Sequence, residues 1–356
     1  MVGVPGPELD AETAVTFRRI QPGAYILFGR NIQSPAQLRK LIDDLRDLSE
    51  VEPIITIDQE GGRVSRLKLI GSEPPNAQQL RDKGDRALIQ LHGEITAEIL
   101  RLFGFNLDLC PVLDISFDDD ADNSLRGRCY GRNVAQVIDF AGAFNDSLRA
   151  GGILSCGKHF PGYSCAGEDP HHDFPSVDRP LAELEAHELA VFRHFADRVD
   201  SMMIGHIHYP DLDPERRPAS LSPRLLRELL VQEMGFAGLI MTDDLDMGAI
   251  INFCGFEEAI ERSVRAGNHL AMICHRVHMA EQAAKVLAAL PPEVTTSALE
   301  AVARFKTRLA PPTAFSIERF HEVDARIAEL RIATLGPELA AQRSPEDGKR
   351  SPVELY

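Results

Sequence analysis

Eight short apolar runs rich in Val, Ile and Leu recur along the sequence. They cover residues 1–4, 24–29, 53–58, 106–115, 153–160, 201–207, 238–244 and 269–274. Within most runs the apolar residues are continuous rather than alternating with polar ones. That pattern is typical of strands buried on both faces of a parallel sheet. The runs therefore predict parallel strands covered by helices.

Helical patterns fill several of the intervals between the runs. They cover residues 35–50, 85–104, 134–152 and 223–235, and the last three end in Gly, a common helix terminator. Strand and helix alternating eight times indicate an α/β fold, the TIM-type (β/α)8 barrel. A doubly wound open sheet is the alternative, because periodicity alone does not show that a sheet closes.

The sequence suggests one catalytic domain with a helical extension. We expect residues 1–290 to form the barrel. Residues 291–335 have helical patterns and are expected to pack on the barrel as C-terminal helices. The segment 336–356 is polar and short of large apolar residues, so an irregular tail is expected there.

Composition excludes several classes of function. The 356 residues carry a formal net charge of −16, which opposes binding to nucleic-acid phosphates. No window reaches the roughly 20 apolar residues of a membrane span, and residues 1–10 lack the pattern of a secretory signal. The six scattered cysteines form no CxxC pair, which favours reduced, mostly buried thiols. We expect a cytoplasmic protein with no nucleic-acid or membrane partner, and nothing in the sequence indicates an oligomeric state.

Ionisable residues occupy the ends of five of the runs. In run order they are Asp58, then Asp108 and Asp114, then Lys158 and His159, then His206, and finally Asp243 and Asp244. A (β/α)8 barrel has its active site at the C-terminal ends of its strands, and buried charge is costly unless it is paired or used. These residues therefore predict a substrate pocket, although any one of them could instead cap a helix.

The segment 158–175 is the most informative loop. It contains three Pro and two Gly among many polar residues, which predicts an irregular loop that can cover the barrel mouth. Asp169 and His171 are two residues apart, so in an extended segment the carboxylate can hydrogen-bond the imidazole. Such a pair suits a general acid or base. A solvated acidic loop with incidental histidines fits this spacing at least as well.

Four ordered segments between residues 1 and about 290 resemble motifs of the bacterial β-N-acetylglucosaminidases of glycoside hydrolase family 3. They are Asp58-Gln59-Glu60-Gly61-Gly62-Arg63-Val64, Gly127-Arg128-Cys129-Tyr130-Gly131, Lys158-His159-Phe160-Pro161-Gly162 with Asp169-x-His171, and Pro218 to Leu245. The resemblance implies a retaining glycosidase on a TIM-type barrel. We expect it to need no cofactor and no metal.

The resemblance also implies a role for individual residues. Asp243 matches the nucleophile, which would form a covalent glycosyl-enzyme. His171 matches the acid/base, and Asp169 matches its partner in the dyad. The positions that match those holding the sugar hydroxyls are Asp58, Arg66, Arg128, Lys158 and His159. The implied substrate is a terminal β-linked N-acetylglucosamine on peptidoglycan fragments.

The sequence departs from the family pattern in three places. Tyr163-Ser164-Cys165-Ala166 replaces a customary His-Gly-Asp-Thr, Cys129-Tyr130 replaces Ser-Phe, and His269 replaces an Asp. We expect these changes to fall in the lid and near the sugar, where they would alter substrate preference.

The alternatives are a β-glycosidase of other specificity, such as a glucosidase or xylosidase, or a phosphorolytic variant. A sugar-binding protein without activity is a further alternative. So is a metal-dependent hydrolase built from Asp58, His159, His206 and Asp243.

Overall fold

The computed structural model describes residues 1–121, 124–162 and 175–344. Eight parallel strands form one sheet in chain order. They are β1 (Val2–Gly3), β2 (Ala24–Leu27), β3 (Ile54–Ile57), β6 (Leu107–Asp108), β7 (Leu154–Phe160), β8 (Ser201–Ile204), β9 (Leu239–Asp244) and β10 (Leu270–Met272). A parallel bridge between Val2 and Ile273 joins the first strand to the last. The predicted (β/α)8 barrel is confirmed, and the open sheet is wrong.

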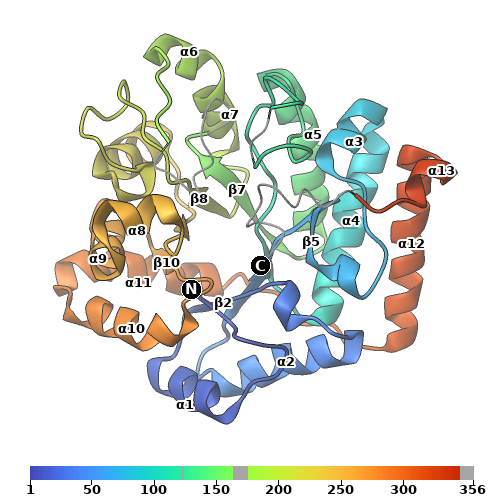
Figure 1. Ribbon diagram of the computed structural model, residues 1–356, viewed down its shortest axis with the longest axis horizontal. Helices are drawn as coiled ribbons and strands as arrows, with labels where there is room; N and C mark the ends of the chain where they lie inside the picture. Colours follow the sequence, from blue (N-terminus) through green and yellow to red (C-terminus); the bar gives the residue numbers. More distant parts are fainter. Residues whose placement is uncertain (122–123, 163–174, 345–356) are drawn as a thin grey trace.

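Helices surround the strands in a ring, which Figure 1 shows approximately along the barrel. The helices that follow successive strands are α1 (Ala11–Ile20), α2 (Pro35–Leu48), α4 (Arg86–Phe103), α5 (Val134–Ala150), α7 (Glu188–Phe195), the π-helix η4 (Arg224–Glu233), α9 (Phe256–Ala266) and α10 (Ala280–Ala289). Shorter helices lie in the connections: α3 (Ala77–Lys83), α6 (Leu181–Ala186) and α8 (Gly248–Cys254). Each of the eight strands is thus followed by a helix on the outside.

Local signals in the sequence explain where these helices begin and end. Ser34 caps α2, because its hydroxyl accepts the N–H of Gln37 while the Gln37 side chain accepts the N–H of Ser34. Asn133 caps α5 with its side-chain oxygen. Gly104 ends α4 in the left-handed conformation, as the Gly at that position predicts.

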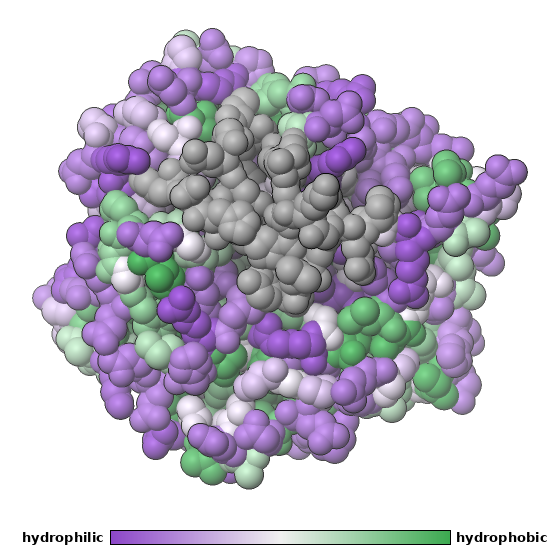
Figure 2. Space-filling model, in the orientation of Figure 1, coloured by the Kyte–Doolittle hydropathy of each residue, from purple (hydrophilic) through white to green (hydrophobic). Residues whose placement is uncertain are grey.

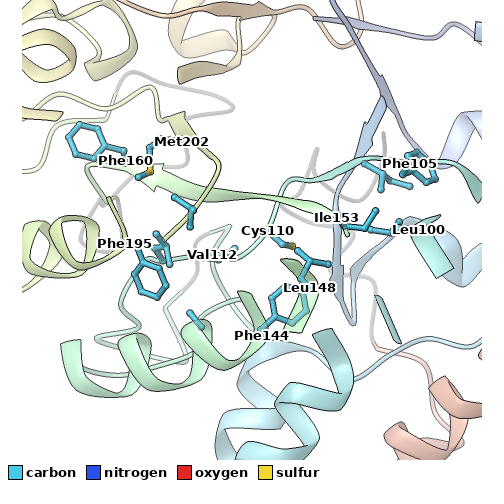
Figure 3. Close-up of a cluster of buried hydrophobic side chains, with 14 of the residues drawn as sticks. Leu100, Phe105, Cys110, Val112, Phe144, Leu148, Ile153, Phe160, Phe195 and Met202 are labelled. Atoms are coloured by element: carbon cyan, nitrogen blue, oxygen red, sulfur yellow. The ribbon is translucent and has the colours of Figure 1, made fainter. Parts of the chain in front are cut away.

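Two hydrophobic layers pack the barrel. One lies between the sheet and the helices, and Figure 3 shows part of it: Phe144 and Leu148 of α5 lie near Cys110, and Phe195 of α7 lies near Val112. The other fills the barrel interior. Its members include Ile26, Ile54, Leu107, Leu154, Met203, Met241 and Met272. Since both faces of each strand are buried, the continuous apolar runs are explained.

The helices after residue 291 lie at two different places. Helix α11 (Pro292–Lys306) brings Ala301 and Phe305 into the interior cluster beside residues that begin the strands, so it covers the N-terminal end of the barrel. Helix α12 (Ile317–Leu335) packs against α4, on the outer ring (Figure 1). The last described segment includes a short helix, α13 (Pro337–Ala340), inside the range for which an irregular tail is predicted.

The described surface around the barrel face in Figure 2 is mostly hydrophilic, with small hydrophobic groups between. Among the described residues, no helix is both long and apolar enough to cross a membrane. Five cysteines lie in the described part and are free thiols, four of them buried. Cys165 lies outside the described residues.

Candidate active site

The C-terminal ends of the strands hold the polar residues that the sequence singled out. Asp58 directly follows β3, and Lys158 and His159 belong to β7. Asp243 is the second-to-last residue of β9. Arg128 lies in the connection between β6 and α5. Parallel strands in a barrel bring these ends to one rim, as expected for an active site.

A small hairpin after β3 adds two more charged side chains to this rim. It consists of β4 (Gln59–Gly61) and β5 (Val64–Ser65), which pair antiparallel. Its turn needs Gly61, which has a φ of 110°, and a Cβ there would lie 2.2 Å from the carbonyl oxygen of Pro75. The hairpin holds Glu60 and places Arg66 directly after it. The pattern of apolar runs did not predict this element, because it is too short and too polar.

Lys158 is the centre of the charged network. Its Nζ lies 2.7 Å from Asp58 Oδ1 and 2.7 Å from Glu60 Oε1, and its side chain is only 2% exposed. Burial by itself would lower the pKa of Lys158, but the two carboxylates outweigh burial and raise its pKa above the usual range. Lys158 is therefore a fixed cation between Asp58 and Glu60.

Glu60 and Arg128 form a two-pronged ion pair. Arg128 donates from Nε to Glu60 Oε2 at 2.8 Å and from Nη2 to Oε1 at 2.7 Å. Burial opposes the charge on Glu60, but Arg128 and Lys158 hold the pKa of that carboxyl well below its usual range. Arg66 Nη2 lies 3.7 Å from Asp58 Oδ2. Positive and negative side chains thus alternate along the rim, and their ion pairs fix the side-chain orientations. Such an arrangement is suited to binding hydroxyl groups.

His159 is oriented by a buried carboxylate. Asp114 Oδ2 lies 2.8 Å from His159 Nδ1 and also accepts the backbone N–H of His159 at 3.1 Å. A carboxylate beside Nδ1 places the proton on that nitrogen and leaves Nε2 as the acceptor when the ring is neutral. His159 Nε2 lies 3.5 Å from Arg128 Nη2, so the imidazole faces the same network.

The two aspartates at the end of β9 have different surroundings. Asp243 is partly exposed, and its Oδ1 accepts the N–H of Asp244 at 2.8 Å. Asp244 is buried, and its Oδ1 accepts the N–H groups of Cys274 and Asp246. Burial, together with the charge of Asp246, raises the pKa of Asp244 well above its usual value. Asp244 therefore supports the loop, whereas Asp243 is partly exposed at the strand end.

His206 braces the same strand end. Its Nδ1 lies 2.7 Å from Ser220 Oγ, and its Nε2 lies 2.9 Å from the backbone carbonyl oxygen of Asp244. A carbonyl only accepts, so Nε2 carries the proton. This contact fixes the backbone next to Asp243.

The structure brings most of the predicted site residues together. Asp58, Arg66, Arg128, Lys158 and His159 belong to one network of short polar contacts. Asp169 and His171 lie outside the described residues. Asp114 was among the run-end residues that predicted the pocket, but no individual role was assigned to it. Glu60 was not predicted as a site residue, although it lies within the Asp58–Val64 motif.

Potential metal ligands group elsewhere than the sequence suggested. Among the His, Cys, Asp and Glu residues that the structure describes, one group could hold a metal ion: Asp244, Cys274 and His275. Their ligand atoms all lie within 4.8 Å of one another. The set of Asp58, His159, His206 and Asp243 forms no such group in the described part of the chain. In that group, His275 Nδ1 is 2.9 Å from Arg30 Nη1, which places a fixed cation beside the imidazole.

Two of the departures from the family pattern do not line the charged rim, contrary to expectation. Cys129 and Tyr130 are buried in the cluster between sheet and helices. His269 precedes β10 at the opposite end of the barrel, where its Nδ1 accepts the N–H of Ile240. Burial there lowers the pKa of His269 to about 4, so the ring is neutral. The third departure, 163–166, lies outside the described residues.

Comparison with known proteins agrees with this geometry. The model of the glycosyl hydrolase family 3 N-terminal domain matches residues 2–307. A curated β-hexosaminidase of Pseudomonas aeruginosa is 32% identical over 288 residues, which cover 81% of this chain and 85% of the relative. A family 3 β-N-acetylglucosaminidase of Paenibacillus superposes with a TM-score of 0.83 at 31% identity, covering 93% of this chain and 66% of that one.

A second solved structure is similar over nearly its whole length. NagZ of Neisseria gonorrhoeae, solved in complex with N-trifluoroacetyl-D-glucosamine, superposes with a TM-score of 0.78 at 28% identity. The superposition covers 93% of this chain and 97% of that one. The barrel, the charged network at its strand ends and the family match over most of the sequence lead to one conclusion: the chain belongs to glycosyl hydrolase family 3 and is a glycosidase.

Proposed function

We propose that this glycosidase is a retaining β-N-acetylglucosaminidase that removes terminal N-acetylglucosamine from peptidoglycan fragments in the cytoplasm. The observation that carries the proposal is the network of Lys158, Asp58, Glu60 and Arg128 at the rim that also bears Asp243. Its buried, mutually oriented charges offer both donors and acceptors to sugar hydroxyls. The β-hexosaminidase relatives support the choice of sugar.

Asp243 is the nucleophile in this proposal. Its carboxylate attacks C1 of the sugar, the bond to the leaving oxygen breaks, and a glycosyl ester forms. Asp243 suits this role better than Asp244 because Asp244 is buried, binds two backbone N–H groups and has a raised pKa. A nucleophilic carboxylate must be ionised and reachable.

The acid/base in this proposal is His171, with Asp169 as the group that orients and charges it. The imidazolium gives its proton to the leaving oxygen in the first step, and the neutral ring takes a proton from water in the second. Water then releases the sugar with its original β configuration, since two inversions at C1 restore it.

The substrate test compares 4-nitrophenyl β-N-acetylglucosaminide with the corresponding β-glucoside and β-xyloside. We expect kcat/KM to be higher for the N-acetylglucosaminide by at least about 10²-fold, because a buried polar site discriminates strongly against a ligand that leaves its groups unpaired. Equal turnover of the glucoside would overturn the choice of sugar. Adding phosphate in the same assay, with product identification, separates hydrolysis from phosphorolysis.

The nucleophile test uses a matched pair of variants. Asp243→Asn should remove nearly all turnover while the melting temperature stays close to that of the wild type, because the amide keeps the shape but cannot form the ester. Asp244→Asn removes a raised-pKa carboxyl and should keep measurable turnover. An inactive Asp244→Asn beside an active Asp243→Asn would reverse the assignment.

A further inference from the structure

Asp108 is a buried carboxyl that the proposed chemistry does not use. It ends β6, pairs in register with Ile57 of β3, and has no exposed surface. Its Oδ1 accepts the backbone N–H of Gln59 at 3.1 Å. Its Oδ2 is buried and makes no hydrogen bond within the described part of the chain. A buried polar atom without a partner is costly, so its presence at this position calls for a role.

Gln59, whose N–H donates to Asp108, connects several residues of the proposed sugar site. Gln59 lies between Asp58 and Glu60 in the sequence. Its side chain donates from Nε2 to Ser65 Oγ at 2.7 Å and accepts the N–H of Leu67 at Oε1 at 3.2 Å. Ser65 and Leu67 are the neighbours of Arg66. Three charged side chains of the rim therefore depend on the position of Gln59.

Burial favours the neutral form of Asp108. The ionisable groups that face it are Asp58, Glu60, Lys158, Cys110, Cys156 and Tyr130. Burial raises the pKa of Asp108 to about 8. The hydrogen bond from the Gln59 N–H and the charge of Lys158 oppose this rise, whereas the carboxylates of Asp58 and Glu60 add to it. Burial raises the pKa of Cys156 to about 12 and moves those of Cys110 and Tyr130 well above their usual values.

An ionised Asp108 would compete for a cation that is already shared. Lys158 Nζ contacts both Asp58 and Glu60 at 2.7 Å. A third carboxylate beneath them would attract the same ammonium group and repel both of its partners. The neutral acid instead accepts the Gln59 N–H without disturbing the ion pairs.

We propose that Asp108 is a positioning residue of the sugar site, a neutral carboxylic acid that holds Gln59 and thereby Asp58, Glu60 and Arg66 in place. The inference rests on the proposed role of these residues in binding the sugar. Loss of a proton from Asp108 loosens the pair of Lys158 and Asp58. Its effect therefore falls on sugar binding rather than on attack by Asp243.

The test measures the affinity of the protein for a neutral monosaccharide by calorimetry between pH 6 and pH 9.5. The ligand is the sugar released from whichever 4-nitrophenyl β-glycoside the wild type hydrolyses, so the result does not depend on the N-acetyl preference. The wild-type dissociation constant should rise about tenfold from pH 7 to pH 9, as expected if only the protonated form binds with full affinity. In Asp108→Asn, which keeps the acceptor oxygen, the rise should be less than about twofold.

Two further variants complete the comparison. Asp108→Leu removes the acceptor and should bind the sugar more weakly at every pH. Thr56→Val is the matched control, because Thr56 lies on β3 opposite Leu107 and its buried hydroxyl also has no hydrogen-bond partner among the described residues. It should keep the wild-type dependence on pH. The same tenfold rise in Asp108→Asn, a flat wild-type profile, or normal affinity in Asp108→Leu would overturn the proposal.

A second readout needs no sugar. In the difference between the infrared spectra of the wild type and Asp108→Asn, the carbonyl band of a protonated carboxylic acid should be present at pH 7 and weaken above pH 8. The difference removes the contribution of Asp244, because both proteins contain that raised-pKa carboxyl. Absence of the band from the difference spectrum would reject the neutral acid. Absence of sugar binding and turnover in a wild type that shows the difference band would instead reject the proposed function.

Discussion

At the scale of single residues, the site depends on charges that are buried only because they are paired. Lys158 and Glu60 are both almost inaccessible, and each has two charged partners within the network. The attraction in such a network is strong because little water screens it, but so is the cost of burying each ion. Removing one charged residue therefore leaves its partners buried without a compensating charge, which destabilises the fold.

We expect Lys158→Met to destabilise the folded protein by about 3–5 kcal/mol, because the buried Glu60 and the half-buried Asp58 lose their shared cation. Urea unfolding measures this change. The control is Lys40→Met, which breaks an exposed ion pair with Asp44 on α2 and should leave the stability almost unchanged. Equal effects of the two variants would contradict the argument from burial.

The raised pKa of Asp108 also predicts how stability depends on pH. Its pKa is about 8 in the folded chain, against roughly 3.9 when unfolded. Between these values the folded state keeps a proton that the unfolded state has lost, so this group makes stability fall as pH rises from about 4 to 8. Asp108→Asn should remove that fall and raise the melting temperature at pH 7. Thermal unfolding across this pH range checks it, and parallel curves for the two proteins would contradict it.

At the scale of elements, short segments outside the regular barrel complete it at both ends. The β4–β5 hairpin carries Glu60 and positions Arg66 at the C-terminal rim. Helix α11 covers the opposite end with Ala301 and Phe305. The first element adds charged groups to the rim, whereas the second packs against the core.

Helix α11 offers a direct test of that packing role. Phe305→Ala should destabilise the protein by about 3–5 kcal/mol, because Phe305 is buried in the interior cluster. Leu299→Ala on the same helix should change stability by less than about 0.5 kcal/mol, since Leu299 is 68% exposed. The KM of Phe305→Ala should stay normal below its melting temperature. A large rise in KM would show that α11 influences the rim.

At the scale of the whole molecule, a balanced charge network lies within a strongly acidic protein. The formal net charge is −16, whereas the rim pairs each buried carboxylate of the network with a cation. The overall field repels anions at a distance, and salt screens this repulsion over roughly 10 Å at 0.1 M. The field therefore acts on the approach of a substrate and leaves the buried contacts almost unchanged.

A substrate with a carboxylate on its aglycone should reveal this field. We expect kcat/KM for such a glycoside to rise with salt between 10 mM and 200 mM, by up to about tenfold. The value for the neutral 4-nitrophenyl glycoside should stay nearly constant over the same range. A fall with salt for the anionic substrate would mean that local cations at the rim dominate its approach.

The fold and the identity of most rim residues could be read from the sequence. Each of the eight apolar runs contains a strand, because burial on both faces imposes a local pattern that needs no partner to be recognised. The polar residues at the run ends meet at one rim because the strands are parallel. Asp58 and Lys158 come together in this way although 100 residues separate them.

The partners and charge states depended on the tertiary structure. The pairing of Glu60 with Arg128, and of Asp114 with His159, follows from barrel closure and strand register, which no local pattern encodes. The departures at Cys129 and Tyr130 are buried in the core, which no local pattern indicated. The neutral state of Asp108 follows from its complete burial. That burial exists only once the neighbouring strands and loops have folded around the carboxyl.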